Sequence, residues 1–175
     1  MSEANKAAAI QRMLRVDQAG EYGAVRIYAG QMAVMGARGP HAQTIMAMAE
    51  QEARHRRDFD ALLSARGGRP TALQPFWHVA GFALGAATAL ISPEAAMACT
   101  AAIETEIDAH YTKQLAQLEG DDPELSALIT EARADEVEHL ETALALGAER
   151  APAYPLLTGA IRLGCRLAIG LCERI

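Results

Sequence analysis

Two short stretches decide the fold: Glu52-Ala53-Arg54-His55 and Glu136-Val137-Glu138-His139. Each has the form Glu-x-x-His, and on an α-helix the positions i and i+3 lie on the same face. One such motif has little weight, because glutamate and histidine are common on solvated helix surfaces. Two of them, in separate helical stretches of a 175-residue chain, indicate two helices that carry matching carboxylate–imidazole pairs.

A glutamate precedes each motif at nearly the same distance. Glu21 lies 31 residues before Glu52, and Glu104 lies 32 residues before Glu136. The chain therefore divides into two similar halves, whose matching residues are 83 or 84 positions apart. One glutamate from each of two helices, with Glu-x-x-His from each of two others, is the ligand pattern of ferritin-like di-iron and di-manganese bundles. The predicted fold is all-α, a ferritin-like four-helix bundle with a di-iron centre.

This set of side chains suits a pair of metal ions. Four carboxylates neutralise two divalent metals, and two neutral imidazoles give each metal one nitrogen and leave positions open for O2. We expect Glu52 and Glu136 to bridge the metals, and Glu21 and Glu104 to bind one metal each. The predicted ligands are Glu21, Glu52, His55, Glu104, Glu136 and His139.

The surroundings of the two upstream glutamates are small or apolar, as in Ala19-Gly20-Glu21-Tyr22-Gly23-Ala24, which indicates acids that point inward. Buried carboxylates without a cation are costly. The alternative is a bundle with interior salt bridges. Of the four metal-bearing helices, however, only the first two offer plausible inward arginines, Arg26 and Arg54.

Other polar residues are candidates for supporting roles. Asp135 precedes Glu136 directly, Gln51 holds the corresponding position in the other half, and Asp17 lies one turn before Glu21. Each of the three is placed to accept the proton of a ligand histidine, although a solvated helix face explains them equally well. His110 and Tyr111 form either a relay of protons or electrons toward the metals or an ordinary part of the core.

Proline, glycine and serine divide the chain into helical segments, and no period-two pattern of a strand competes with them. The whole chain, residues 1–175, is expected to form one domain. The predicted helices run from an N-cap at Ser2 to about Met35, from Pro40 to about Ala65, from Ser92-Pro93 to about Leu118, from Asp122-Pro123 to about Leu146, and from Leu156 to Ile175.

Two apolar segments are ambiguous. Residues 71–93 contain no Asp, Glu, Lys or Arg, and the apolar part, Phe76–Ile91, is shorter than the roughly 20 residues of a transmembrane helix. It is either a core helix or a surface that enters one leaflet of a membrane. The last segment carries Arg162 and Arg166 one turn apart among leucines, which is as typical of an interfacial helix as of a core one.

Composition excludes several function classes. The net charge of −6 and the lack of a basic stripe argue against a nucleic-acid partner. Cys99, Cys165 and Cys172 are odd in number and lie in apolar stretches, which indicates reduced, buried thiols. Residues 1–9 show no signal or transit pattern, so the expectation is a protein that starts in the cytoplasm or has already been processed.

Several longer runs resemble the demethoxyubiquinone hydroxylases of ubiquinone biosynthesis. The resemblance extends from about Arg12 to Ile175, and its six metal ligands fall on the six residues chosen above by spacing. The matching runs are Arg15–Ala24, Arg26–Val34, Gly81–Ala86, Ala96–Thr100, Ala151–Tyr154 and Glu173–Ile175. This chain departs from the family at Arg133-Ala134-Asp135-Glu136, where members often have Arg-Asp-Glu-Glu, and at Thr112, where they have Asn.

The resemblance implies a monooxygenase with two iron ions per chain that uses O2 to hydroxylate the ring of a polyprenylated demethoxyquinol. It implies a peripheral membrane protein at the cytoplasmic face of the cell membrane, with the two apolar segments in contact with lipid. A lipid-presenting or biosynthetic partner is also expected, and the His110-Tyr111 pair is expected to connect the irons to the quinone ring or to a reductant.

Two questions stay open on the sequence alone. The electrons come from NADH, from a reductase or from the quinol itself, and no GxGxxG fingerprint points to a Rossmann domain. The alternative function, which belongs to a different class, is that of an iron-storage or metal-buffering subunit. A long charge-free segment, however, suits a soluble storage shell poorly.

Overall fold

The computed structural model describes residues 3–175, in which six α-helices and one short 3-10 turn account for the regular structure and no strand is present. The elements are α1 (Glu3–Met35), α2 (Ala42–Ala65), α3 (Gln74–Ile91), α4 (Pro93–Leu118), α5 (Pro123–Ala145), η1 (Ala148–Arg150) and α6 (Tyr154–Cys172). The predicted N-cap, Ser2, lies outside the described residues.

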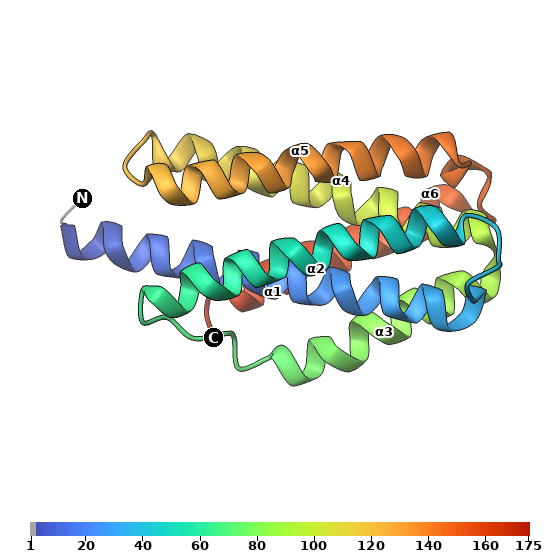
Figure 1. The fold of residues 1–175 in the computed structure, drawn as a ribbon, viewed down its shortest axis with the longest axis horizontal. Helices are drawn as coiled ribbons and strands as arrows, with labels where there is room; N and C mark the ends of the chain where they lie inside the picture. Colours follow the sequence, from blue (N-terminus) through green and yellow to red (C-terminus); the bar gives the residue numbers. More distant parts are fainter. Residues whose placement is uncertain (1–2) are drawn as a thin grey trace.

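Four long helices form the bundle that the two motifs predicted. α1 packs against α2 and α4 packs against α5, and the two pairs lie along the long axis of the molecule (Figure 1). The remaining two helices lie outside these pairs, with α3 against α1 and α6 mainly against α4. Each half of the chain therefore contributes two bundle helices followed by one covering helix, and the predicted ferritin-like fold is confirmed.

The helix starts follow local chemistry. The Oγ of Ser92 accepts a hydrogen bond from the Ala95 N–H at 3.0 Å, and the Oδ1 of Asp122 accepts one from the Leu125 N–H at 3.1 Å. In both cases a proline occupies the first turn, where its missing N–H is not needed, and both predicted starts are confirmed.

The predicted start of the second helix is wrong by two residues, because α2 begins at Ala42 and not at Pro40. His41 has a φ of 63°, in the left-handed region, and its side chain makes no capping hydrogen bond. Pro40 and His41 still belong to the turn, in which Gly39 lies directly against the Met35 carbonyl, where a Cβ would be 2.4 Å from the oxygen.

Glycines bring α3 into direct backbone contact with α1. A Cβ on Gly85 would lie 1.9 Å from the Ile27 carbonyl oxygen, and one on Gly30 would lie 2.1 Å from the Phe82 carbonyl oxygen. No other residue type fits at these two positions without displacing backbone. The charge-free segment is therefore a helix that presses one glycine-lined face on the bundle and leaves its other face outside.

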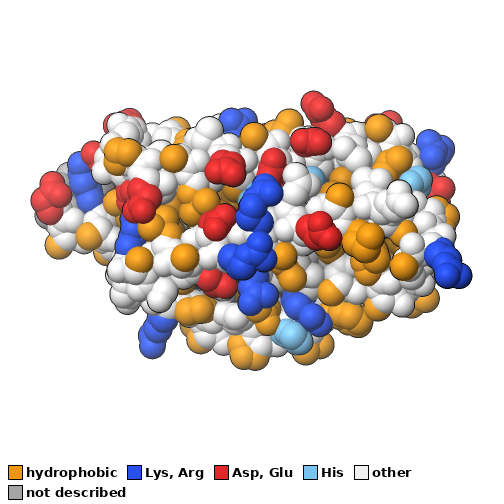
Figure 2. Space-filling view, viewed as in Figure 1, with side chains coloured by type: hydrophobic (Ala, Val, Ile, Leu, Met, Phe, Trp, Pro, Cys, Tyr) orange, Lys and Arg blue, Asp and Glu red, His pale blue; other side chains and the backbone are white. Residues whose placement is uncertain are grey.

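The outer faces of α3 and α6 are apolar, and we call them together the apolar face. Its members include Phe76, Val79, Leu90 and Ile91 on α3 and Leu156, Leu163, Leu167 and Leu171 on α6. The side of the molecule drawn in Figure 2, over α2 and α5, instead shows acidic and basic side chains interspersed. Of the described helices, α6 is the one whose length and hydropathy would allow it to cross a membrane.

The two arginines of α6 are both engaged within the protein. Arg162 Nε lies 2.6 Å from Oε1 of Glu106 on α4, and Arg166 Nε lies 3.5 Å from Oε2 of the same carboxylate. The Glu106 carboxylate is nearly buried and requires a cationic partner, which explains why the arginines turn toward α4.

Candidate metal centre

The six predicted ligands meet in the middle of the bundle. Each of their side chains is at most 3% exposed, and they come from all four bundle helices. They form two groups, in each of which one oxygen or nitrogen atom from every residue lies within 4.8 Å of those of the others. One group contains Glu21, Glu52, His55 and Glu136, and the other contains Glu52, Glu104, Glu136 and His139. Glu52 and Glu136 belong to both groups, the arrangement that bridging carboxylates require.

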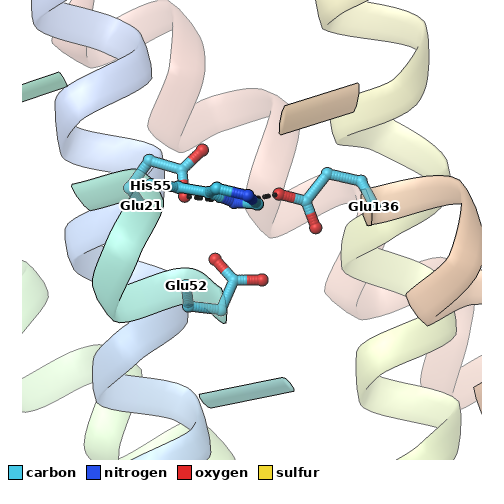
Figure 3. A group of neighbouring side chains, drawn as sticks. All are labelled: Glu21, Glu52, His55 and Glu136. Atoms are coloured by element: carbon cyan, nitrogen blue, oxygen red, sulfur yellow. Dashed lines mark ion pairs between the residues drawn. The ribbon is translucent and has the colours of Figure 1, made fainter. Parts of the chain in front are cut away.

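The two oxygens of Glu136 face different histidines. Oε1 lies 3.4 Å from the Nδ1 of His55, and Oε2 lies 3.1 Å from the Nδ1 of His139. The Nδ1 of His55 also lies 3.6 Å from Oε2 of Glu21, and the Nδ1 of His139 also lies 3.2 Å from Oε1 of Glu52. Figure 3 shows the first group, with His55 between Glu21 and Glu136 and with Glu52 turned toward the same space.

Several of these buried atoms have no hydrogen-bond partner. They include Oε2 of Glu21, Oε1 of Glu52 and Nδ1 of His55. Orphaned polar atoms in a protein interior are rare, and here they converge on one point from separate helices. Carboxylate oxygens and imidazole nitrogens are also the donors that iron accepts. The residues present therefore fit a pair of metal ions.

The charges of the cluster lead to the same conclusion. Burial and the negative charge of Glu136 raise the pKa of Glu52 and of Glu104 well above the usual value for a glutamate, and burial also raises the pKa of Glu21. Burial acts on Glu136 in the same direction, but the imidazoles of His139 and His55, each close to one of its oxygens, lower its pKa to about 2. The cluster thus attracts positive charge, which protons or metal cations can provide.

The outer nitrogens of the two histidines are bound crosswise. Nε2 of His55 lies 2.9 Å from Oδ2 of Asp135, and Nε2 of His139 lies 3.0 Å from Oε1 of Gln51. Each acceptor directly precedes the Glu-x-x-His motif of the opposite half. These acceptors favour a proton on Nε2, which leaves Nδ1 free toward the cluster. The predicted contacts of Asp135 and Gln51 with the histidines are confirmed.

Asp17 does not contact either of these histidines, so its predicted role is wrong. Its Oδ1 accepts a hydrogen bond from Nε2 of Gln114 at 2.8 Å and lies 3.3 Å from Nε2 of His110. The difference comes from packing, because at this level of the bundle Asp17 faces α4, which carries both Gln114 and His110.

Tyrosines hold the two outer glutamates. The Tyr111 hydroxyl donates a short hydrogen bond to Oε1 of Glu21, and the Tyr28 hydroxyl donates one to Oε1 of Glu104 at 3.4 Å. Tyr28 was missed by the sequence analysis. The signal was present, because each tyrosine follows a glutamate of its own helix by seven residues and the two lie 83 positions apart, as do Glu21 and Glu104.

A cavity of about 550 Å³ lies beside the cluster, between α1, α3, α4 and α6. Its walls are almost wholly apolar and include Ile27, Trp77, Leu84, Ile107 and Ile161. Its few polar side chains are Asp17, His110 and Tyr111. Since Tyr111 also contacts Glu21, this residue connects the cavity with the metal centre.

The family model of the ubiquinone biosynthesis protein COQ7 matches residues 8–172. The chain belongs to this family. The matched region includes α1 from residue 8 onward, the other five helices, the carboxylate–imidazole cluster and the apolar cavity, and the resemblance seen in the sequence is confirmed.

Relatives within the COQ7 family include hydroxylases from distant organisms. The 3-demethoxyubiquinol 3-hydroxylase of Rhodospirillum rubrum is 53% identical over 169 residues, which cover 97% of this chain and 80% of the relative. The human NADPH-dependent 3-demethoxyubiquinone 3-hydroxylase, mitochondrial, is 50% identical over 172 residues, with 96% and 79% covered. The 5-demethoxyubiquinone hydroxylase of Saccharomyces cerevisiae is 44% identical over 186 residues, with 97% and 80% covered. These COQ7-family matches give no support to iron storage.

Proposed function

We propose that this chain is a 3-demethoxyubiquinol 3-hydroxylase, which uses O2 to hydroxylate the quinol ring in ubiquinone biosynthesis. The observation that carries the proposal is the apolar cavity whose polar end, Tyr111, contacts the carboxylate–imidazole cluster through Glu21. Such a cavity suits a quinol ring with the first part of its tail, and the printed name of the Rhodospirillum rubrum relative gives the reaction.

In this proposal the cluster holds two irons. Glu52 and Glu136 would be shared by the two irons, Glu21 and His55 would complete one site, and Glu104 and His139 would complete the other. When bound, the irons supply the redox chemistry that O2 needs for reaction with a ring carbon. The protein contributes the fixed positions of the ligands and an apolar environment that excludes water from the reacting ring.

The polar end of the cavity orients the substrate. Tyr111 and His110 are adjacent in the cavity wall, and Asp17 lies behind His110. A quinol hydroxyl bound at this end would face the His110 ring, which lines the cavity. We propose that His110 and Tyr111 carry protons or electrons between the ring, the solvent side and the metal centre. Their effect depends on the hydrogen bond from Tyr111 to Glu21.

We propose a nicotinamide nucleotide, NADH or NADPH, as the source of electrons. The printed names of the human and mouse relatives describe NADPH-dependent enzymes. Without a Rossmann fingerprint, the nucleotide would bind to the surface of the helical bundle.

The apolar face is the proposed contact with the membrane. A polyprenylated quinol is insoluble in water, so an enzyme that acts on its ring must meet it at a lipid surface. Walls of the cavity come from α3 and α6, the same two helices that carry the apolar face. We propose a peripheral protein at the cytoplasmic face of the cell membrane, with the quinol tail left in lipid. A lipid-presenting or biosynthetic partner would bind beside this face.

The decisive experiment uses protein purified without O2 and loaded with iron. We expect two irons per chain, and on mixing with NADH, 18O2 and a short-tailed demethoxyquinol we expect a ring-hydroxylated product that contains one 18O atom. Mass spectrometry detects the label, and a reaction without iron is the control. Oxidation of many irons per chain without a hydroxylated product would instead identify a storage protein.

A further inference from the structure

The two halves of the metal centre have unequal outer partners. The residue behind His55 is Asp135, a carboxylate, whereas the residue behind His139 is Gln51, a neutral amide. The hydrogen bonds are almost equal in length, at 2.9 Å and 3.0 Å. The difference between the halves is therefore one of charge and not of geometry.

A charged acceptor changes the histidine that it binds. A hydrogen bond from an imidazole N–H to a carboxylate is stronger than one to an amide oxygen, and it makes the opposite ring nitrogen a better electron donor. Asp135 also binds Arg54 through the same Oδ2, at 2.6 Å, but the Arg54 side chain is 44% exposed, and such an exposed ion pair contributes little and leaves Asp135 a carboxylate. The carboxylate consequently remains the more polarising of the two partners.

The half of the metal centre with the more strongly electron-donating histidine, His55, is also the half beside the cavity. Glu21 and His55 belong to the same group, and Glu21 accepts the hydrogen bond of the cavity residue Tyr111. The opposite half has Tyr28 in the place of Tyr111, and Tyr28 does not line the cavity.

We propose that Asp135 and Gln51 make the two metals chemically unequal, so that the metal bound by Glu21 and His55, next to the substrate cavity, is the more easily oxidised of the pair. Asp135 is then a positioning residue that acts through His55, and Gln51 is its weaker counterpart behind His139. This inference rests on the proposed di-iron centre but not on its reaction. Its readouts are metal affinity and spectra.

The test exchanges the charges of the two partners: Asp135 is replaced by a neutral amide, and Gln51 is replaced by a carboxylate. In the wild type, Mössbauer spectra of the fully reduced 57Fe protein should show two distinct quadrupole doublets, and Co2+ should bind the metal-free protein in two unequal steps. Asp135→Asn should bring the two doublets together and weaken the tighter step by roughly 10–100-fold. Gln51→Glu should also bring them together, by strengthening the weaker step. Asp135→Glu keeps a carboxylate behind His55 and should retain the wild-type pattern.

The control is Asp108→Asn, which removes a surface carboxylate that binds Arg133 and should change neither readout. The inference is wrong if the wild type shows two equivalent metals, or if Asp135→Asn and Gln51→Glu both leave the two doublets as they were. If Asp135→Asn does not fold, as judged by circular dichroism, Gln51→Glu decides alone by whether the doublets converge. A wild type that binds two unequal metals but forms no hydroxylated product would contradict the proposed function and support this inference.

Discussion

The hydroxyl of Tyr111 on α4 donates a hydrogen bond to Glu21 on α1, and in the opposite direction the hydroxyl of Tyr28 on α1 donates one to Glu104 on α4. The two bundle halves are thus connected by a reciprocal pair of tyrosine–glutamate contacts across the metal centre. Only Tyr111 of the two tyrosines also faces the apolar cavity.

This difference gives a prediction for a matched pair of variants. Tyr111→Phe should keep two irons per chain but slow hydroxylation by about 10–100-fold, because it removes a hydrogen bond to a carboxylate worth about 1.5–3 kcal/mol beside the substrate. Tyr28→Phe removes the equivalent contact away from the cavity and should reduce turnover much less. Single-turnover kinetics with iron analysis measures both, and equal losses would contradict a special role of Tyr111.

The bridging assignment predicts the loss of the paired site in Glu136→Ala. This change removes both oxygens that face His55 and His139, so a coupled pair of irons can no longer bind. Mössbauer spectroscopy and metal analysis should show at most one iron per chain. Glu138→Ala, which removes an exposed glutamate of the same helix, is the control and should retain two. A coupled pair in Glu136→Ala would exclude a bridge at this position.

Membrane binding should depend on the centre of the apolar face. Val79 is 66% exposed and Leu167 is 60% exposed, and each would gain about 1.5–3 kcal/mol on burial in lipid. The double variant Val79→Asp/Leu167→Asp should therefore bind anionic vesicles at least about a hundredfold more weakly in a flotation assay. Turnover on a water-soluble ring analogue should be nearly unchanged. Leu144→Asp, at an exposed leucine of α5, should float like the wild type.

The close contact of α3 and α1 predicts that Gly85→Ala destabilises the fold. The added methyl group would lie 1.9 Å from the Ile27 carbonyl oxygen, so the helices must separate, at a cost of about 1–3 kcal/mol. Gly159→Ala, where nothing lies within 4 Å, should be neutral or stabilising by up to about 1 kcal/mol through helix propensity. Urea unfolding measures both, and a neutral Gly85→Ala would mean that the contact is easily relaxed.

The cap of α5 should contribute stability that depends on pH. Asp122 caps α5 and also binds Arg66 at the end of α2, so Asp122→Ala should lower the free energy of unfolding by about 1–2 kcal/mol at pH 7. Hydrogen bonding to Arg66 lowers the pKa of Asp122 in the folded state. The contribution is therefore present above the unfolded pKa of roughly 4 and is lost as the pH falls through the lower, folded value.

The measurement is urea unfolding between pH 2.5 and 7. The gap between Asp122→Ala and wild type should close below about pH 4. Asp58→Ala, at an exposed aspartate within α2, should lie within about 0.5 kcal/mol of the wild type throughout. A gap that persists unchanged into acid would mean that the ionised carboxylate is not what stabilises this helix start.

The bundle and the ligand cluster were accessible from the sequence because both depend on regular spacing. Glu21, Glu104 and the two Glu-x-x-His motifs repeat at an offset that helical geometry converts into one shared interior face. Asp135 and Gln51 were recognised from adjacency, but their crosswise pairing required the distance between α2 and α5. Tyr28 was missed because one aromatic residue in a helix predicts nothing until its symmetric partner is considered.

Other features depend on contacts between segments that spacing does not reveal. Asp17 faces His110 and Gln114 because of how α1 meets α4. Leu84 lies in a charge-free stretch that suggested lipid contact, yet it lines the cavity, whereas Val79 five residues earlier is exposed. The sequence predicts that α3 is apolar, but only packing on α1 decides which of its faces remains outside.

The crosswise hydrogen bonds of Asp135 and Gln51 have a consequence for the chain as a whole. Neither half contains a complete environment for even one metal, because each ligand histidine receives its outer partner from the other half. The metal centre is in this sense the interface of an internal dimer, joined between α3 and α4. A chain cut at Ser92 would produce two fragments that must associate before either could be fully coordinated, so metal uptake would measure the affinity of one half for the other.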